Sequence, residues 1–501
     1  MRLSSLITLI ILIGASDLLS GQPSPENGLK QEKWGQCKSE DSAQAIAACS
    51  ELIGSGDMAE GTVGEAFEKR GLAYFRKGDY DRAIEDFDQA LRLKPKYGGA
   101  FLARANAYVE KKDYDLAIRD YDQVLRLDPD SARAFYDRGI ANTYKGTYDR
   151  AIQDYDHALH LKPGNADSLY GRGLAFMRKG DYDLAIQNYD EALRINPTHV
   201  AALGGRAWSY SQKGDYDRAI QDYDQEVRLN PGLADALYCR GRAFAHRHDY
   251  DRAIQDYTQA ARLKPSDPNV FDGLGSAYWQ KGNYDRTIEN YDQALRLRPV
   301  DAVALVGRGL AYWAEGGYDR AIQDYDDALR LEPNSTDAFY NRGLAYASKG
   351  DSNRAIEDYS QALRLKPTDT DSLYHRGLAY AHTGDYEDAI QDYSHVLSIK
   401  PTDVNTLGVR GVAYTKEGDY ARAIQDFDQA LLMDPRFGFG FGKRSIVYAR
   451  KGEYGRSISD WSRWLWLKYG FLGITIRLFI LVLTVGLGFW LKRFRQEANV
   501  Q

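Results

Sequence analysis

The chain has 501 residues, of which 44% are hydrophobic and 27% charged, the balance of a folded protein. Its formal net charge of −6 gives no electrostatic reason to expect nucleic acid as a partner, and three cysteines are too few for a small disulfide-built fold. The 37 tyrosines are far more than an ordinary core needs, which indicates one unit copied many times.

The first 21 residues have the layout of a secretory signal peptide. Arg2 precedes an apolar run from Leu6 to Ile13, which is too short to cross a bilayer, and small residues follow it. We therefore predict a signal peptide over residues 1–21. The cleavage position stays open, and an uncleaved N-terminal anchor is the alternative.

Residues 22–63 are expected to hold a linker and a degenerate half-repeat. The sequence around Ala45 and Ile46 follows the second-helix pattern of the repeats described next. A half-repeat of this kind would shield the first full repeat from solvent. In an oxidising compartment Cys37 and Cys49 would form a disulfide, and the alternative is a pair of reduced, buried thiols.

A strict period of 34 residues organises most of the chain. Eleven prolines follow it from Pro95 to Pro435 without an insertion, and a period of this length is typical of a helix–turn–helix array. In the first repeat Ala66–Phe75 fits one helix, which Lys77-Gly78 closes. Tyr80–Leu93 fits the second helix, which Pro95 stops.

The residue types within each repeat are also specific. With Pro95 at position 32, Phe67 stands at position 4, Gly71 at position 8 and Tyr74 at position 11. In these positions the chain resembles the tetratricopeptide-repeat (TPR) family, in register through twelve repeats and over about four-fifths of its length. The resemblance implies an all-α, right-handed superhelical α-solenoid of about twelve 34-residue helix–turn–helix repeats over residues 64–469.

One departure from the family is systematic. Position 7 carries arginine, as at Arg70, where the family usually has an aliphatic residue, and Leu274 is the exception. Asp86 and its counterparts at position 23 could pair with these arginines. We expect a ladder of Arg–Asp pairs between helices rather than a cationic binding stripe.

The tyrosines that packing does not explain suggest a binding surface. Twenty-nine tyrosines occupy positions 11, 17 and 24, five others share position 5, and Tyr144 is at position 13. The resemblance implies that positions 5 and 13 line a concave groove, together with positions 9 and 12. Aromatic side chains rimmed by polar ones are typical of a protein- or peptide-binding face, and surface drift is the alternative. The candidate groove residues are Tyr136, Tyr144, Tyr170, Trp208, Tyr238, Trp279, Trp313, Tyr340 and Tyr374.

No catalytic constellation or cofactor motif stands out, so we expect neither an enzyme nor a cofactor. Two histidine-containing groups, around His375 and around His246, are interpreted as solvated groove residues. His375 and His382 lie about 10.5 Å apart along a helix, which is too far for one metal ion, so no metal site is expected. The family's grip on a C-terminal carboxylate needs lysine at position 5, which never occurs here.

The C-terminal residues are strongly apolar. Residues 470–491 carry one charge, Arg477, and would extend about 33 Å as a helix, against a hydrocarbon core of about 30 Å. We predict a single transmembrane helix there and a short basic cytoplasmic tail over residues 492–501, because Lys492 and Arg493 follow the span. Together with the signal peptide, this predicts a single-pass membrane protein with its repeats outside the cytoplasm, periplasmic if bacterial.

The favoured function is a membrane-anchored extracytoplasmic scaffold that binds proteins or peptides in its concave groove. The alternative is a structural accessory of an envelope-biogenesis or secretion complex, with polysaccharide as a further ligand of the aromatic groove. The expected partners are protein or peptide ligands and the membrane, with no nucleic acid.

Overall fold

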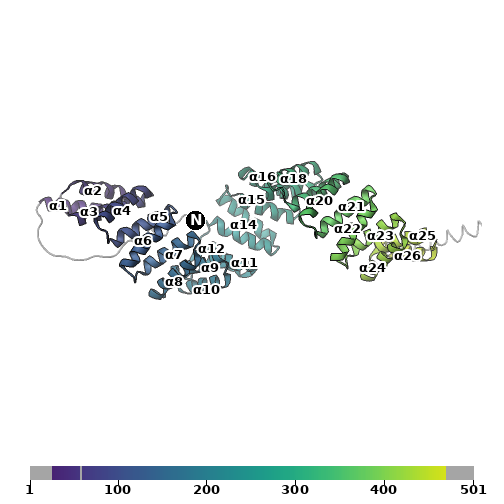
Figure 1. The fold of residues 1–501 in the computed structure, drawn as a ribbon, viewed down its shortest axis with the longest axis horizontal. Coiled ribbons are helices and arrows are strands. Elements are labelled where there is room, and N and C mark those ends of the chain that lie inside the picture. The colour runs from purple at the N-terminus through teal and green to yellow at the C-terminus, as the bar shows by residue number, and fades with distance from the viewer. Residues whose placement is uncertain (1–24, 57–58, 470–501) are drawn as a thin grey trace, which may run out of the picture. The chain divides into compact units, whose positions relative to one another are not determined.

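The computed structural model describes residues 25–56 and 59–469. These residues form 26 α-helices joined by short turns (Figure 1). The chain divides into an N-terminal unit, Met1–Gly232, and a C-terminal unit, Leu233–Gln501, and each unit is described by itself.

The described part of the N-terminal unit consists of helices that follow one another in pairs. They are α1 (Pro25–Cys37), α2 (Ser42–Gly54), α3 (Glu60–Arg76), α4 (Tyr80–Leu93), α5 (Gly98–Glu110), α6 (Tyr114–Leu127), α7 (Ala132–Lys145), α8 (Tyr148–Leu161), α9 (Ala166–Lys179), α10 (Tyr182–Ile195), α11 (Val200–Gln212) and α12 (Tyr216–Leu229).

The C-terminal unit continues the same pattern. Its described helices are α13 (Ala234–His246), α14 (Tyr250–Leu263), α15 (Pro268–Gln280), α16 (Tyr284–Leu297), α17 (Ala302–Ala314), α18 (Tyr318–Leu331), α19 (Thr336–Ser348), α20 (Ser352–Leu365), α21 (Thr370–Thr383), α22 (Tyr386–Ile399), α23 (Val404–Glu417), α24 (Tyr420–Met433), α25 (Gly438–Arg450) and α26 (Tyr454–Tyr469). The helices from α3 onward therefore form the twelve predicted repeats.

Local sequence explains where each helix ends. The first helix of a repeat stops at position 15 in the left-handed conformation, which glycine adopts without steric cost, as at Gly146 with φ 87°. The second helix begins after an N-cap, as at Asp215, whose carboxylate accepts a hydrogen bond from the backbone N–H of Arg218. The second helix ends before the proline at position 32, because proline has no backbone N–H to continue the helical hydrogen bonds.

Two repeats lack glycine at position 15, and substitutions at this position test its effect on stability. Ten of the twelve repeats have glycine at position 15, but Lys112 and His248 stand there with φ 64° and 61°. The left-handed conformation costs a residue with a side chain about 1–2 kcal/mol. We expect Lys112→Gly to raise the free energy of unfolding by about 1 kcal/mol in urea denaturation. Gly146→Ala, the matched control, should lower it, and a destabilised Lys112→Gly protein would contradict the account.

The aromatic residue at position 24 joins three helices. Tyr155 on α8 is 1% exposed, and its ring lies between Gly139 of the paired α7 and Gly171 of the next helix, α9. A Cβ atom added at Gly139 or Gly171 would come within 2.9 Å or 2.6 Å of the ring. Real Cβ contacts are longer than this, so only glycine at both positions leaves room for the ring. The ring thus packs against two successive repeats and connects them.

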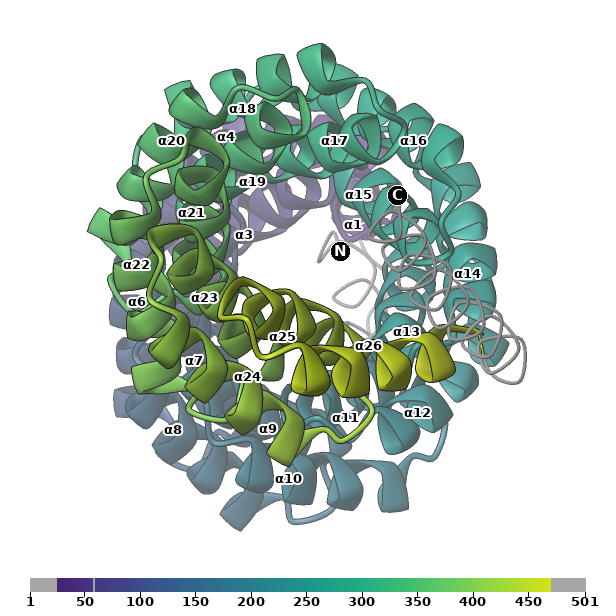
Figure 2. The same cartoon turned by 90° about the vertical axis from the view of Figure 1, so that its right-hand side faces the viewer.

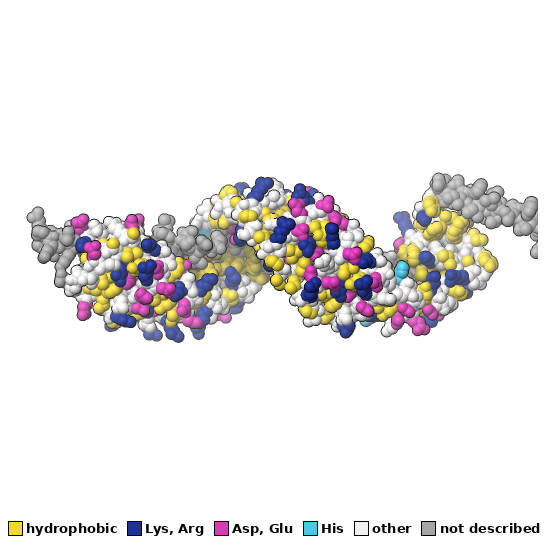
Figure 3. All heavy atoms as spheres, turned by 90° about the horizontal axis from the view of Figure 1, so that it is seen from above, with side chains coloured by type: hydrophobic (Ala, Val, Ile, Leu, Met, Phe, Trp, Pro, Cys, Tyr) yellow, Lys and Arg dark blue, Asp and Glu magenta, His cyan; other side chains and the backbone are white. Residues whose placement is uncertain are grey.

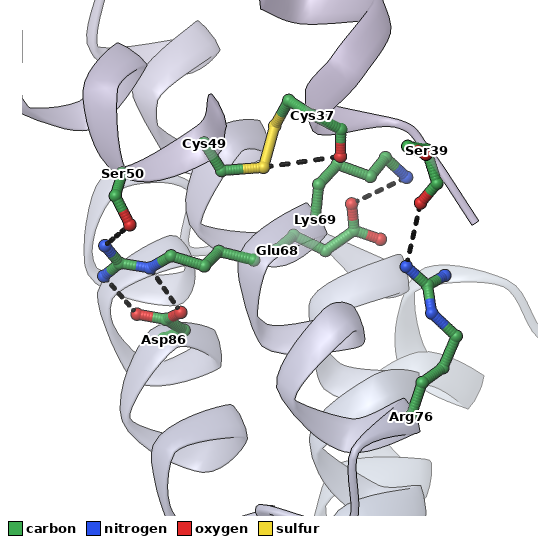
Figure 4. The surroundings of a disulfide bond; sticks show 9 residues. Cys37, Ser39, Cys49, Ser50, Glu68, Lys69, Arg76 and Asp86 are labelled. Carbon is green, nitrogen blue, oxygen red and sulfur yellow. Dashed lines mark hydrogen bonds and ion pairs between the residues drawn. A yellow bond between two sulfur atoms is a disulfide. The ribbon is translucent and has the colours of Figure 1, made fainter. Parts of the chain in front are cut away.

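The predicted half-repeat at the N-terminus is present as α1 and α2. Cys37 at the end of α1 and Cys49 in α2 are joined by a disulfide, the pairing that the sequence suggested (Figure 4). Arg70 on α3 donates to Ser50 Oγ on α2 at 3.0 Å, while its other nitrogens bind Asp86. Arg70, and Arg76 through the backbone oxygen of Ser39, thus join the half-repeat to the first full repeat by hydrogen bonds.

One part of the predicted fold class is wrong. Within residues 25–56 and 59–469 we find no helix that combines the length and the apolar character needed to cross a membrane. α26, for example, has 16 residues and includes Asp460 and Arg463, whereas a span needs about 20 mostly apolar residues. Over these described residues the fold is an all-α repeat solenoid in which no membrane-spanning helix is found.

The predicted single-pass localisation depended on that helix, and it is withdrawn with it. The segments on which it was based, residues 1–21, 470–491 and 492–501, lie outside the described residues.

Candidate functional site

The first helix of each repeat provides the surface on which the candidate residues lie. In the C-terminal unit α15, α17, α19 and α21 lie on the inner side of the curve, and α16, α18, α20 and α22 lie on the outer side (Figure 2). Position 8 of the first helix faces its partner, because Gly343 packs on Tyr359 of α20. Positions 2, 9 and 13 lie about 100–140° around the helix from position 8 and turn away from the partner helix, whereas positions 5 and 12 lie about 40–60° from it, at the edge of the contact with the partner. We call the surface formed by these five positions the inner face.

The predicted groove residues lie on the inner face, but most are mainly buried. Tyr144 is 45% exposed, and the other eight are partly buried. Each tyrosine at position 5 touches the buried tyrosine at position 24 of its own repeat. The ring centroids are 6.0 Å apart for Tyr136–Tyr155, 6.0 Å for Tyr170–Tyr189, 5.7 Å for Tyr238–Tyr257, 6.0 Å for Tyr340–Tyr359 and 6.1 Å for Tyr374–Tyr393.

These tyrosines therefore have two roles in the structure. One side of each ring completes the core, and the rest of the ring is available on the inner face. Burial raises the pKa of Tyr170 and of Tyr340 to about 12, so that both hydroxyls stay protonated and can donate hydrogen bonds near neutral pH.

The tryptophans are also held in place. Trp208 meets Tyr182 edge-on with ring centroids 5.7 Å apart, and Trp279 lies 5.2 Å from Tyr284. Trp313 Nε1 donates a hydrogen bond to Ser348 Oγ at 3.0 Å, which links α17 to α19. Rigid aromatic side chains of this kind lose little conformational freedom when a partner binds.

The arginine at position 7 is structural, as predicted, and makes more contacts than predicted. Arg342 Nε and Nη2 bind the two carboxylate oxygens of Asp358 at 2.8 Å and 2.6 Å. Its third nitrogen, Nη1, binds Asp326 of the preceding repeat at 2.5 Å. The same three-way contact recurs at Arg104, Arg138, Arg206, Arg308 and Arg444.

The repeat that lacks arginine at position 7 supports a structural role for the arginines in the other repeats. The repeat with Leu274 at position 7 also has Asn290 at position 23, and the preceding repeat has Thr258 at position 25. All three members are therefore uncharged together. A buried aspartate without its arginine would be an unpaired buried charge, which is costly.

The outer surface carries a second, exposed set of ion pairs. Lysines at position 14 contact aspartates at position 18 of the preceding repeat, as in Lys179–Asp149 at 2.8 Å and Lys349–Asp319 at 2.5 Å. On the face seen in Figure 3, basic and acidic side chains are interspersed rather than separated by sign. Exposed pairs of this kind add little stability but leave no broad patch of one sign on that face.

In three consecutive repeats a buried tyrosine hydroxyl lacks a hydrogen-bond partner among the described residues. The three hydroxyls are those of Tyr325, Tyr359 and Tyr393 at position 24. By contrast, the Tyr121 hydroxyl donates to Asn106 Oδ1 at 2.7 Å.

This contrast predicts opposite results for one substitution. Tyr359→Phe should leave the melting temperature unchanged or raise it, because it removes a hydroxyl that makes no hydrogen bond. Tyr121→Phe should lower the free energy of unfolding by about 1 kcal/mol, because it breaks a bond and strands Asn106. Equal losses in the two variants would mean that the Tyr359 hydroxyl has a partner after all.

The histidine-containing groups show no metal geometry. In the part of the chain that the structure describes, we find no set of three His, Cys, Asp or Glu side chains arranged to hold a metal ion. His375 instead packs among tyrosines, with ring centroids 5.7 Å from Tyr340 and 5.4 Å from Tyr374, and burial lowers its pKa. A shallow cleft of about 720 Å³ near Tyr414 and Tyr420 includes none of the predicted groove residues.

Comparison with known families identifies the class of protein. A tetratricopeptide-repeat model matches residues 205–268, 273–336, 308–370 and 340–404, and others match 105–170, 65–97, 166–199, 404–437 and 188–221. These matches cover most of the chain, and it belongs to the tetratricopeptide-repeat family. No curated protein matches the sequence.

Solved structures share the fold at low identity. A TPR protein from Parabacteroides merdae is 22% identical over 50% of this chain and 98% of its own, with a TM-score of 0.40. In the Cut9–Hcn1 hetero-tetramer of the APC/C, the similar chain is 17% identical over 91% of this chain and 96% of its own, with a TM-score of 0.41. YrrB, described as a TPR protein with an unusual peptide-binding site, is 24% identical over 37% of this chain and 95% of its own, with a TM-score of 0.33. These likenesses concern the helical repeat fold alone.

Proposed function

We propose that this protein is a non-enzymatic scaffold that binds a protein or peptide along its inner face. The observation that carries the proposal is the row of tyrosines at position 5. Their rings are fixed against the core on one side and partly exposed on the other. Aromatic side chains held in this way are the usual anchors of protein interfaces.

The charged residues support the same assignment. The arginines at position 7, which recur in all repeats but the one with Leu274, are engaged in the ladder with position 23, as in Arg206–Asp222 at 2.7 Å. They stabilise the repeat and leave the aromatic inner face as the surface that varies from one repeat to the next. Repeat arrays commonly use such an extended inner surface for binding.

The test begins with peptides selected by the full chain from a random display library. Their affinity is then measured for Tyr170→Ala/Tyr374→Ala, which removes one anchor from each unit. We expect affinity to fall at least about tenfold, because interface tyrosines often contribute more than 1.4 kcal/mol each. The control is Arg92→Ala/Arg126→Ala, which changes two exposed side chains on α4 and α6. Unchanged affinity of the tyrosine variant, with a lowered melting temperature, would make these side chains purely structural.

A further inference from the structure

The inner face of α19 and α21 carries two exposed carboxylates that differ from the acidic residues at the same position of other repeats. Asp337 and Asp371 stand at position 2 of these helices, and both are exposed. Neither forms an ion pair or a side-chain hydrogen bond within the described residues. The acidic residues at this position in other repeats are paired. Glu65 contacts Lys94 at 2.7 Å, Asp167 contacts His199 at 3.3 Å and Asp235 contacts Lys264 at 3.2 Å.

Most of the cations near these two carboxylates are bound to other acidic side chains. Arg342 and Arg376 are bound to the ladder aspartates Asp358 and Asp392. Lys366 bonds Asp369 at 3.0 Å and also acts electrostatically on Asp337 and Asp371. Lys400 follows Asp371 at the 29-residue spacing that separates Lys94 from Glu65. These two lysines are outnumbered, because Asp369 and Asp403 act on Tyr340 and Tyr374 in addition to the two carboxylates. His375 lies beside Asp371, but burial lowers its pKa, so the ring is neutral at neutral pH. The local charge on this part of the inner face is therefore negative.

Tyrosine rings lie next to the carboxylates. Tyr340 and Tyr374 follow Asp337 and Asp371 by three residues, which places each pair on one side of its helix. Asp371 on α21 also acts on Tyr340 of α19, the first helix of the preceding repeat, since its charge helps to raise the pKa of that phenol.

Apolar surface continues along both helices. Leu344 and Leu378 stand at position 9, one turn beyond the tyrosines, and both are partly buried against the core. Carboxylate, aromatic ring and aliphatic side chain therefore follow one another on α19, and the same order repeats on α21.

We propose that the inner face of α19 and α21 binds a basic, apolar peptide segment. Arginine or lysine side chains of the partner pair with Asp337 and Asp371 and lie over the rings of Tyr340 and Tyr374, and its apolar side chains rest on Leu344 and Leu378. A cation placed over an aromatic face beside a carboxylate gains from both contacts. The assignment rests on the proposed function, because it names the partner class for that binding face.

The probe is a fluorescein-labelled peptide of alternating leucine and arginine, whose binding to the full chain is followed by fluorescence anisotropy. The matched probe has glutamate in place of every arginine. We expect the arginine peptide to bind and the glutamate peptide not to bind. Asp337→Asn/Asp371→Asn should weaken binding of the arginine peptide about tenfold, and rising salt should reduce the affinity of the unchanged protein.

The control variant makes the same change in net charge elsewhere. Asp149→Asn/Asp183→Asn neutralises two exposed carboxylates on α8 and α10, and it should leave the affinity unchanged. Equal weakening in both variants, or equal binding of both peptides, would overturn the proposal. If the library-selected peptides still depend on Tyr170 and Tyr374 in that case, the scaffold function stands and only the partner class is wrong.

Discussion

Arg342→Leu is expected to lower the free energy of unfolding by about 3–5 kcal/mol, because it strands a buried carboxylate. Asp358 is 4% exposed, and Arg342 supplies both of its charged hydrogen bonds. Since each repeat contacts only its neighbours, the loss should concentrate in α19 and α20. Guanidinium denaturation measures the total, and amide hydrogen exchange locates it.

Another repeat of the chain suggests a triple variant that should restore the lost stability. Arg342→Leu/Asp358→Asn/Asp326→Thr copies the uncharged rung formed by Leu274, Asn290 and Thr258, and it should recover most of the lost stability. Arg354→Ala is the control, since its pair with Asp351 is exposed and should matter much less. A triple variant no more stable than Arg342→Leu would show that the arginine contributes mainly through packing rather than by neutralising Asp358 and Asp326.

Tyr189→Ala should cost about 3–5 kcal/mol, and Tyr170→Ala about 1–2 kcal/mol. The two rings touch, but Tyr189 is fully buried, whereas Tyr170 keeps part of its surface exposed on the inner face. Thermal unfolding followed by circular dichroism compares the two variants directly.

Because the side chains are in contact, their effects should not add in the double variant. If Tyr170→Ala lowered the stability as much as Tyr189→Ala does, both rings would belong to the core. In that case the tyrosines at position 5 could no longer be regarded as anchors for a partner.

The sequence was sufficient to predict the interactions within one repeat. The period, the two helices and the pairing of Arg70 with Asp86 all follow from residues that belong to the same helical hairpin. The contact between Arg342 and Asp326 was not predicted, since it depends on how far neighbouring repeats are offset when they stack. The regular acidic or hydroxyl residue at position 25 was the signal that could have revealed it.

The exposure of the tyrosines at position 5 was predicted only in part. The sequence suggested that they face away from the core, because other tyrosines already fill it. In the structure Gly173 adds no side chain between the helices, so Tyr189 comes close enough to touch Tyr170. The depth of burial thus depends on a glycine in the same helix, which the spacing of the tyrosines does not show.

The inner face is the central element of the account, and crosslinking tests it most directly. A photoreactive benzophenone side chain is placed at Leu310 or Leu344 on the inner face, or at Arg330 or Arg364 on the exposed side of α18 and α20. A library-selected peptide should crosslink from Leu310 and Leu344 and not from the two arginine positions. Crosslinks that come chiefly from Arg330 and Arg364 would place the partner on the outer helices and contradict the account.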